Sequence, residues 1–450
     1  MKFVSTGGQS PAVDLRTALT QGLAPDGGLY LPERMDPVDA TVLAGLHGQS
    51  FSVVSRAVAR HLLGSIVPPD DLDRIVDGAL NFEVPLVTLT DNGSTREDGP
   101  ADGPADGPMD DLYLLELFHG PTLAFKDVGA RFMAQLVGYL GNEGEAPLTI
   151  LAATSGDTGS AVAQAFFGLP GIRTVILFPK GKVTPLQERQ FTTLGGNVRV
   201  LEVDGTFDDC QHLVKSAFSD PILADEIRLS SANSINIGRL LPQIFYYVHA
   251  AAQLPTGSAP LFSVPSGNFG NLTAALMAKR LGVASRGFVA ATNVNDMVPE
   301  YLQTGVVRPR PSIPTVSNAM DVGDPSNLAR ILALYDGDVD RLRKDLIGSV
   351  HDDDETRRCI KRVYRRASYV LDPHSAVGYL GAEAGRRAFG EGPCVVLCTA
   401  HPVKFREAVE PEIGGEVPIP ERLAACLRAE RHVTPIPPEM SALKDFLLAD

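Results

Sequence analysis

The 450-residue chain has no tryptophan, few cysteines and no excess of basic residues. Acidic residues outnumber basic ones by 54 to 40, which gives a formal net charge of −14. Such a charge argues against nucleic acid or an anionic membrane as a main partner. No apolar run reaches the length that spans a bilayer, and residues 1–5 lack the apolar core of a signal peptide. We therefore predict a cytoplasmic protein that binds neither nucleic acid nor membrane.

The cysteines are scattered and odd in number: Cys210, Cys359, Cys394, Cys398 and Cys426. Cys394 and Cys398 lie in an apolar, strand-like run, and their spacing is not that of a zinc site. We expect reduced structural thiols and no bound metal. The chain is long for one hydrophobic core and fits two or three packed units.

A single lysine, Lys126, stands in an otherwise apolar stretch. Residues 112–118 before it read as a buried strand, and residues 129–140 after it read as an apolar helix. Desolvation by the apolar neighbours disfavours the ammonium form and makes the amine a better nucleophile, which is what a Schiff-base lysine needs. A lysine that extends from a helix start into solvent is the alternative, and this segment alone leaves both open.

Two glycine-rich loops follow, at residues 154–159 and 266–271. Each comes after an apolar run and opens a helical pattern. A strand, a glycine-rich turn and a helix together aim free backbone N–H groups at an anion. One such loop is more often an ordinary turn, because α/β proteins use glycine there for its geometry. Two of them downstream of a buried lysine favour a cofactor that carries a phosphate.

Strand-like and helix-like runs alternate along most of the chain, which predicts largely parallel sheets with helices on both faces. The predicted strands are 112–118, 148–153, 174–178, 198–203, 261–264, 287–291 and 394–398. The predicted helices are 52–63, 71–80, 129–140, 160–167, 185–194, 207–218, 238–254, 353–367 and 375–387. The tail after Val409 is rich in Pro and Glu and is expected to pack at the periphery.

Residues 91–111 break this alternation with a repeated Asp-Gly-Pro-Ala unit and almost nothing apolar. Such a tract buries too little surface to offset its ordering entropy. We predict a flexible surface loop, and a docking role for it is the less favoured alternative.

Several segments, taken in order and spacing along nearly the whole chain, resemble those of the threonine synthases. These enzymes use pyridoxal phosphate and have the tryptophan-synthase-β-like fold. The matching segments are 21–30, 119–127, 154–159, 231–239, 264–271, 290–296, 317–322, 372–377 and 398–405. The resemblance implies conversion of O-phospho-L-homoserine and water to L-threonine and phosphate, by γ-elimination and β-addition of water, as the last step of threonine biosynthesis.

The resemblance also implies an α/β fold of two layered domains with mostly parallel sheets flanked by helices, plus an N-terminal extension. We expect an N-terminal region at 1–112, a smaller domain at 113–245 with the cofactor lysine, and a larger domain at 246–450 with the phosphate loop. The enzyme is expected to act as a monomer or a homodimer.

For the cofactor, the resemblance assigns Lys126 as the attachment and catalytic residue and Thr399 as the partner of the pyridine nitrogen. Asp157 is placed near the ring hydroxyl, where a carboxylate is repelled unless one of the two groups holds a proton. Capping of the next helix is the competing role for Asp157. The cofactor phosphate is assigned to Gly267, Asn268, Phe269, Gly270 and Asn271.

For the substrate, the resemblance assigns the α-carboxylate to Thr154, Ser155 and Thr158, and the phosphate to Asn233, Ser234 and Arg239. An arginine on a solvated helix face is the alternative for Arg239. Ala319, within the segment 317–321, is expected to line the site opposite the cofactor ring.

Rival functions differ in what they need from the same residues. A threonine-synthase-like phospho-lyase or a serine/threonine dehydratase shares Lys126 and the phosphate loop but acts on another substrate or gives another product. A non-enzymatic scaffold predicts a lost lysine or loop, and both are intact. A nicotinamide-dependent oxidoreductase is excluded because neither loop has the G-x-G-x-x-G spacing.

Overall fold

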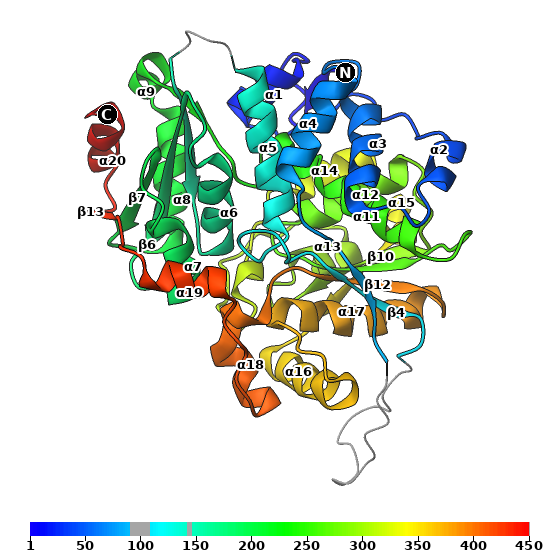
Figure 1. Cartoon of the computed structure of the whole chain (residues 1–450). Helices are drawn as coiled ribbons and strands as arrows, with labels where there is room; N and C mark the ends of the chain where they lie inside the picture. The colour runs from blue at the N-terminus through cyan, green and yellow to red at the C-terminus, as the bar shows by residue number, and fades with distance from the viewer. Residues whose placement is uncertain (91–108, 142–145, 450) are drawn as a thin grey trace.

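The computed structural model describes residues 1–90, 109–141 and 146–449. Of the predicted flexible loop at 91–111, residues 91–108 lie outside the described residues. The fold contains two main β-sheets, both largely parallel. One of them lies with α6, α7 and α8 on the left of Figure 1. The other lies below and to the right, against α17.

The larger sheet has six strands in the order β11-β10-β9-β12-β4-β3. All neighbours are parallel except β3 and β4. The strands are β3 (Leu86–Thr88), β4 (Leu112–Glu116), β9 (Leu261–Pro265), β10 (Gly287–Thr292), β11 (Leu346–Val350) and β12 (Cys394–Cys398). Every residue of β9, β10 and β12 is buried, because helices cover both faces of a parallel sheet.

The smaller sheet has five parallel strands in the order β13-β7-β6-β5-β8. They are β5 (Leu148–Ala153), β6 (Ile172–Pro179), β7 (Val198–Val203), β8 (Arg228–Ser230) and β13 (Thr434–Ile436). A separate antiparallel pair joins β1 (Phe3–Ser5) to β2 (Tyr30–Pro32). The α/β prediction with mostly parallel sheets is confirmed.

Helices fill the space around the sheets. The N-terminal helices are α1 (Leu15–Gln21), α2 (Ala40–Gly45), α3 (Phe51–Leu63) and α4 (Pro69–Ala79). All of them except α1 lie at the upper right of Figure 1. Around the smaller sheet lie α6 (Asp157–Phe166), α7 (Pro185–Thr192), α8 (Phe207–Ser219), α9 (Pro221–Glu226), α19 (Glu421–Arg428) and α20 (Met440–Ala449). The remaining helices of the C-terminal half are α13 (Met297–Thr304), η1 (Asn318–Met320), α14 (Leu328–Leu334), α15 (Val339–Asp345), α16 (Asp353–Ala367), α17 (Pro373–Phe389), η2 (Pro402–Phe405) and α18 (Arg406–Ile413).

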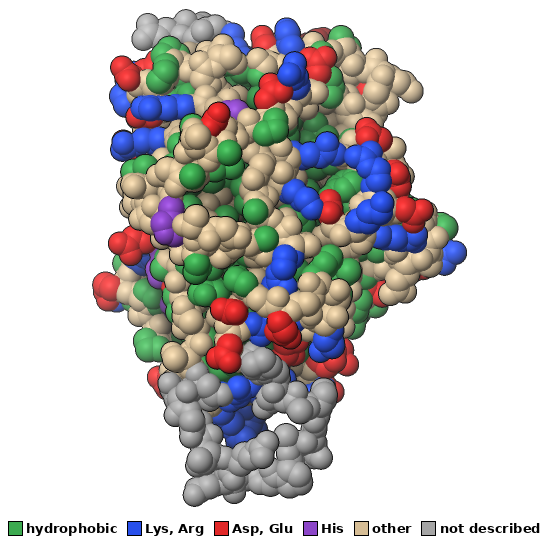
Figure 2. All heavy atoms as spheres, turned by 90° about the vertical axis from the view of Figure 1, so that its right-hand side faces the viewer, with side chains coloured by type: hydrophobic (Ala, Val, Ile, Leu, Met, Phe, Trp, Pro, Cys, Tyr) green, Lys and Arg blue, Asp and Glu red, His purple; other side chains and the backbone are tan. Residues whose placement is uncertain are grey.

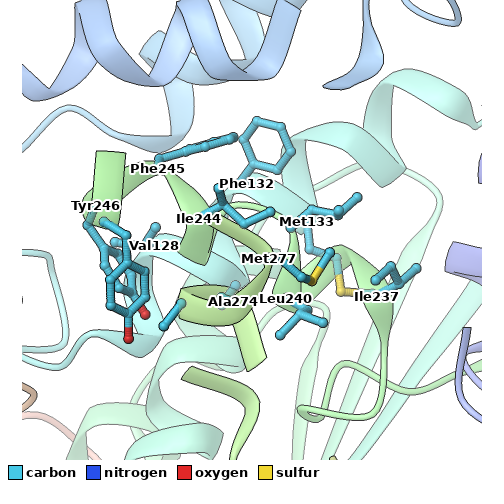
Figure 3. Close-up of a cluster of buried hydrophobic side chains, with 14 of the residues drawn as sticks. Val128, Phe132, Met133, Ile237, Leu240, Ile244, Phe245, Tyr246, Ala274 and Met277 are labelled. Carbon is cyan, nitrogen blue, oxygen red and sulfur yellow. The ribbon is translucent and has the colours of Figure 1, made fainter. Parts of the chain in front are cut away.

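Four helices pack together between the two sheets: α5 (Lys126–Leu140), α10 (Ile237–Leu240), α11 (Gln243–Gln253) and α12 (Gly270–Arg280). Figure 3 shows their buried contacts, with Phe132 of α5 against Phe245 of α11. The ring centroids of these two residues are 5.3 Å apart in an edge-to-face arrangement, which is favourable for aromatic pairs. This packing fixes the start of α5 relative to the start of α12.

One prediction about a helix is wrong. The helix predicted at 238–254 is two helices, α10 and α11, because Pro242 lies between them and has no N–H to continue the ladder. The tail after Val409 packs at the periphery, as predicted, because β13 is an edge strand of the smaller sheet. Its strand β13 pairs with β7, and Leu443 and Leu447 of α20 are buried against α8.

Domain limits at 1–112, 113–245 and 246–450 stay a prediction. The sheets cross these limits, since β4 pairs with β12 and β13 pairs with β7. On the face shown in Figure 2, acidic and basic side chains are interspersed. Within the described residues, no helix is long and apolar enough to cross a membrane.

Candidate active site

All the site residues predicted from sequence line one cavity of about 2020 Å³. Both sheets contribute to it, because the carboxyl ends of β5, β9 and β12 each lead into a lining segment. In parallel sheets, the residues that follow the strands are the usual place for a ligand site. The cavity extends well beyond the residues around Lys126 and reaches the N-terminal segment at residues 20–29.

Lys126 is the first residue of α5 and is half-buried at the cavity wall. The segment before it is tied to the end of β12, where the Phe125 N–H donates to the Thr399 carbonyl over 2.9 Å. Burial lowers the pKa of Lys126 to about 8, and the nearby charges of Asp157 and Arg239 act in opposite directions, raising and lowering it respectively. With this pKa, roughly a tenth of the amine is uncharged at pH 7, far more than for a lysine in water.

The turn between β9 and α12 has the geometry of an anion cradle. Phe269, at the helix N-cap, has a φ of 59° and makes no side-chain cap, so the first N–H groups of α12 are left for a ligand. At Gly267, a Cβ would lie 2.7 Å from the Cα of Met320, so only glycine allows this close approach. Asn268 joins the turn to its surroundings by donating to Ser234 Oγ over 2.5 Å.

The side chain of Asn271 shows most clearly that the turn suits an anion. Its side-chain oxygen accepts hydrogen bonds from the hydroxyls of Tyr246 and Tyr247, each over 2.6 Å. Its side-chain nitrogen is buried and has no partner. A buried donor without an acceptor is costly, so a ligand oxygen at this position satisfies a specific need. A phosphate group fits the turn on this observation.

The loop after β5 is held by its own first residue. Thr154 Oγ1 accepts from the N–H groups of Gly156 and Gly159 over 2.9 and 2.7 Å. The hydroxyl of Thr154 is therefore used inside the loop. Ser155 and Thr158 are half-buried at the cavity wall, and binding of a substrate carboxylate by them stays a prediction.

Asp157 is the first residue of α6, and its side chain does not cap the helix. Gly156 is the N-cap, without a side-chain cap bond. Instead, the Asp157 carboxylate accepts from Gln187 Nε2 over 2.8 Å and from Lys404 Nζ over 2.9 Å. Burial opposes ionisation, but the charges of Lys404 and Lys126 and these bonds lower the pKa of Asp157 to about 2. The capping alternative is wrong, and the carboxylate is ionised.

Arg239 is buried on α10, so the alternative of a solvated arginine is wrong. One terminal nitrogen donates to the Ala232 carbonyl, and Nε is buried without a partner. Burial lowers the pKa of Arg239 to about 10, with the charge of Asp127 acting in the opposite direction. Asn233 and Ser234 also line the cavity. The three residues predicted to bind the substrate phosphate therefore line the same cavity.

Ala319 lines the cavity on η1, where its carbonyl oxygen lies close to Gly267, and a histidine holds it there. Its N–H donates to His374 Nε2 over 3.2 Å, while His374 Nδ1 lies 2.6 Å from Asp372 Oδ2. Nδ1 therefore carries the proton and Nε2 acts as an acceptor. His374 has no free nitrogen for proton transfer in this arrangement, so its observed role is to position η1.

Some residues of the site were not predicted. Tyr246 and Tyr247 orient Asn271, and Lys404 pairs with Asp157 from a position 247 residues away. Tyrosines in an apolar helix and a lysine among apolar residues were the available signals, but neither names its partner. Within the described residues, no group of three or more His, Cys, Asp or Glu could hold a metal ion.

Three family profiles match the sequence. One, described as pyridoxal-phosphate dependent enzyme, covers residues 102–400. Two others, described as threonine synthase N terminus and threonine synthase C-terminal, cover residues 2–80 and 375–447. Together they span most of the chain and include every candidate site residue.

Individual relatives agree with the profiles. A threonine synthase of Serratia marcescens is 43% identical over 453 residues, which cover 100% of this chain and 99% of the relative. The crystal structure of threonine synthase from Escherichia coli is 40% identical, with a TM-score of 0.88 and full coverage of both chains. The structure of PLP-bound threonine synthase from Brucella melitensis is 36% identical, with a TM-score of 0.89 and coverage of 100% and 99%.

Proposed function

Since this chain belongs to the threonine synthase family of pyridoxal-phosphate dependent enzymes, we propose that the cavity is the active site in which O-phospho-L-homoserine and water are converted to L-threonine and phosphate. One observation carries the proposal: the amine of Lys126 and the anion cradle of residues 267–271 line the same cavity.

The cofactor phosphate is assigned to Gly267, Asn268, Phe269, Gly270 and Asn271. The free N–H groups at the start of α12 and the unpartnered amide nitrogen of Asn271 support this assignment. Bound there, pyridoxal phosphate supplies an electron sink that makes the protons on Cα and Cβ of an attached amino acid removable.

Lys126 attaches the cofactor and then acts in proton transfer. Its lowered pKa leaves roughly a tenth of the amine uncharged at pH 7, which is enough for it to take the proton from the substrate Cα and return one later. Thr399 lines the cavity, and its hydroxyl is assigned to the pyridine nitrogen. A hydroxyl donates to a neutral nitrogen, whereas a carboxylate keeps the nitrogen protonated. Asp157 is assigned to the ring hydroxyl.

The substrate is held at both of its charged ends. Ser155 and Thr158, on the loop that Thr154 shapes, bind the α-carboxylate. Asn233, Ser234 and Arg239 bind the phosphate, and the buried, unpartnered Nε of Arg239 supports this assignment. Ala319 is assigned to the side of the site opposite the cofactor ring.

We extend the proposal to the setting of the enzyme. The protein acts in the cytoplasm, binds no nucleic acid and works as a monomer or a homodimer. The negative net charge of −14 supports the absence of nucleic acid. A division of the chain at 1–112, 113–245 and 246–450 is part of the same proposal, and all three parts contribute residues to the cavity.

The test is to incubate the cofactor-loaded protein with O-phospho-L-homoserine and to measure phosphate and amino-acid products together. Threonine formed one-for-one with phosphate supports the proposal. Phosphate with 2-oxobutanoate contradicts it and indicates a phospho-lyase on the same scaffold. Lys126→Ala should abolish turnover, whereas Lys279→Ala, which alters a lysine paired with Asp345 outside the cavity, should leave it unchanged.

A further inference from the structure

A buried ion pair joins the two sheets at the wall of the active-site cavity. Lys404 is on η2, which follows the last strand of the larger sheet, and Asp157 begins α6, which follows β5 of the smaller one. Their charged atoms are 2.9 Å apart, with side-chain exposures of 0% and 4%. Asp157 lines the cavity, whereas Lys404 lies behind it and does not.

Such a pair needs an explanation beyond stability. Taking two charges out of water costs as much as their attraction returns, so apolar residues of similar volume often serve a fold equally well. Asp157 also has a second donor in Gln187, at 2.8 Å, which a neutral side chain could use as well. The position of the pair, rather than its strength, indicates what it does.

Asp157 acts on the amine of Lys126. Burial lowers the pKa of Lys126, the negative charge of Asp157 opposes this effect, and the positive charges of Arg239 and Lys404 reinforce it. Without Lys404, the carboxylate would hold the ammonium form of Lys126 more strongly. In pyridoxal phosphate, the aldehyde carbon that reacts with the lysine is bonded to a ring carbon, and the adjacent ring carbon bears the phenolic oxygen. A net negative charge beside the Lys126 amine therefore also acts on that oxygen.

We propose that Lys404 is a positioning residue that neutralises Asp157 at the cofactor-attachment site, so that the amine of Lys126 stays available and the phenolic oxygen of the cofactor meets no net negative charge. This inference rests on the proposed attachment of the cofactor to Lys126. The groups whose charges act there come from four elements: Lys126 of α5, Asp157 of α6, Arg239 of α10 and Lys404 of η2.

The test uses the cofactor-free protein, in which the amine of Lys126 can be followed directly. Acetic anhydride, which has no titrating group, is applied across a range of pH, and modification of the Lys126 peptide is quantified by mass spectrometry. Lys404→Met should move the midpoint of this pH dependence upward by about 1 pH unit. The double variant Asp157→Asn/Lys404→Met should return the midpoint close to that of the unaltered protein, because it removes both charges.

If Lys404 had only a structural role, its loss would not raise the midpoint of Lys126 modification, and the second substitution at Asp157 would not restore it. An unchanged midpoint in Lys404→Met overturns the inference, and so does a double variant shifted as far as the single one. Lys404→Gln, which keeps a donor for Asp157 but no charge, carries the comparison if Lys404→Met does not fold. Lys444→Met breaks the 2.9 Å pair with Asp220, neither residue of which lines the cavity, and should shift nothing.

A second readout follows the cofactor itself. Titration of the cofactor-free variants with pyridoxal phosphate should show at least tenfold weaker binding in Lys404→Met and recovery in the double variant. Borohydride reduction of the loaded, unaltered protein shows independently whether the cofactor is on Lys126. A cofactor found elsewhere refutes the proposed attachment, whereas a cofactor on Lys126 with equal affinities in all variants refutes only the role of Lys404.

Discussion

The hydroxyl of Tyr246 lies 2.6 Å from the side-chain oxygen of Asn271 and fixes which end of that carboxamide remains free. Tyr247 makes the same contact from the next position of α11. Because the oxygen is committed to the two tyrosines, the nitrogen is the end left for a ligand. Figure 3 places Tyr246 beside the apolar contacts of α5 and α12, so the packing of the core orients a group of the phosphate cradle.

Removing either hydroxyl should therefore weaken cofactor binding. We expect Tyr246→Phe and Tyr247→Phe each to lower the free energy of unfolding by about 1 kcal/mol and to weaken pyridoxal phosphate binding a few-fold. The double variant should lose more than the sum, since the carboxamide is then free to turn. Cofactor titration and urea unfolding measure both effects. Tyr139→Phe, which removes an exposed hydroxyl bonded to Asp71, is the control and should bind as the unaltered protein does.

The close approach at Gly267 gives a second prediction. A Cβ there would lie 2.7 Å from the Met320 Cα and 2.9 Å from the Ala319 carbonyl oxygen, both of them backbone atoms. Gly267→Ala should push η1 away from the cradle and weaken cofactor binding at least tenfold. Gly138→Ala is the matched control, because its Cβ meets open space on α5 and alanine favours the helix. Equal affinities in the two variants would contradict the role of the close approach.

The sequence predicts some of these features well and others not at all. The limits of β5, β7 and β12 agree with the structure to the residue. β5 and β12 are buried along their whole length and are nearly continuous apolar runs, whereas β7 carries the exposed Arg199 and the half-buried Glu202 among buried apolar residues. Strand β11 was missed because Gly348 and Ser349 break its apolar run and only part of the strand is buried. Its place at the edge of the larger sheet explains that weaker pattern.

The candidate site divides in the same way. Lys126 and the turn at 266–271 could be found because local order along the chain, strand then glycine then helix, is itself the signal. The partners of Asp157 and Asn271 could not be found, because they depend on how distant segments pack. Asp157 and Lys404 are 247 positions apart, and no local pattern relates them.

The buried amine of Lys126 makes the stability of the cofactor-free protein depend on pH. Its pKa falls from 10.5 to about 8 on folding, so between these values the unfolded chain binds more protons and stability rises with pH. Replacing Lys126 by Met should therefore stabilise the protein at pH 7 by about 2 kcal/mol more than at pH 10. Urea unfolding at the two pH values measures this difference. Lys182→Met, at an exposed position, should show no such dependence.

Arg239 should govern the affinity for substrate rather than for cofactor. Its guanidinium is buried, one nitrogen is anchored on the Ala232 carbonyl and Nε is left without a partner. Lysine keeps the charge but loses the planar fork that binds two phosphate oxygens at once. We expect Arg239→Lys to raise the KM for O-phospho-L-homoserine at least tenfold and to leave the affinity for pyridoxal phosphate unchanged.

Steady-state kinetics and cofactor titration on the same preparation separate these two effects. Arg34→Lys is the control, since this arginine is exposed and pairs with Asp36 outside the cavity. Weaker cofactor binding in Arg239→Lys, with KM unaltered, would place Arg239 in the cofactor site instead. Because Ala232 anchors Arg239 just before Asn233 and Ser234, that result would also require a new assignment for these two residues.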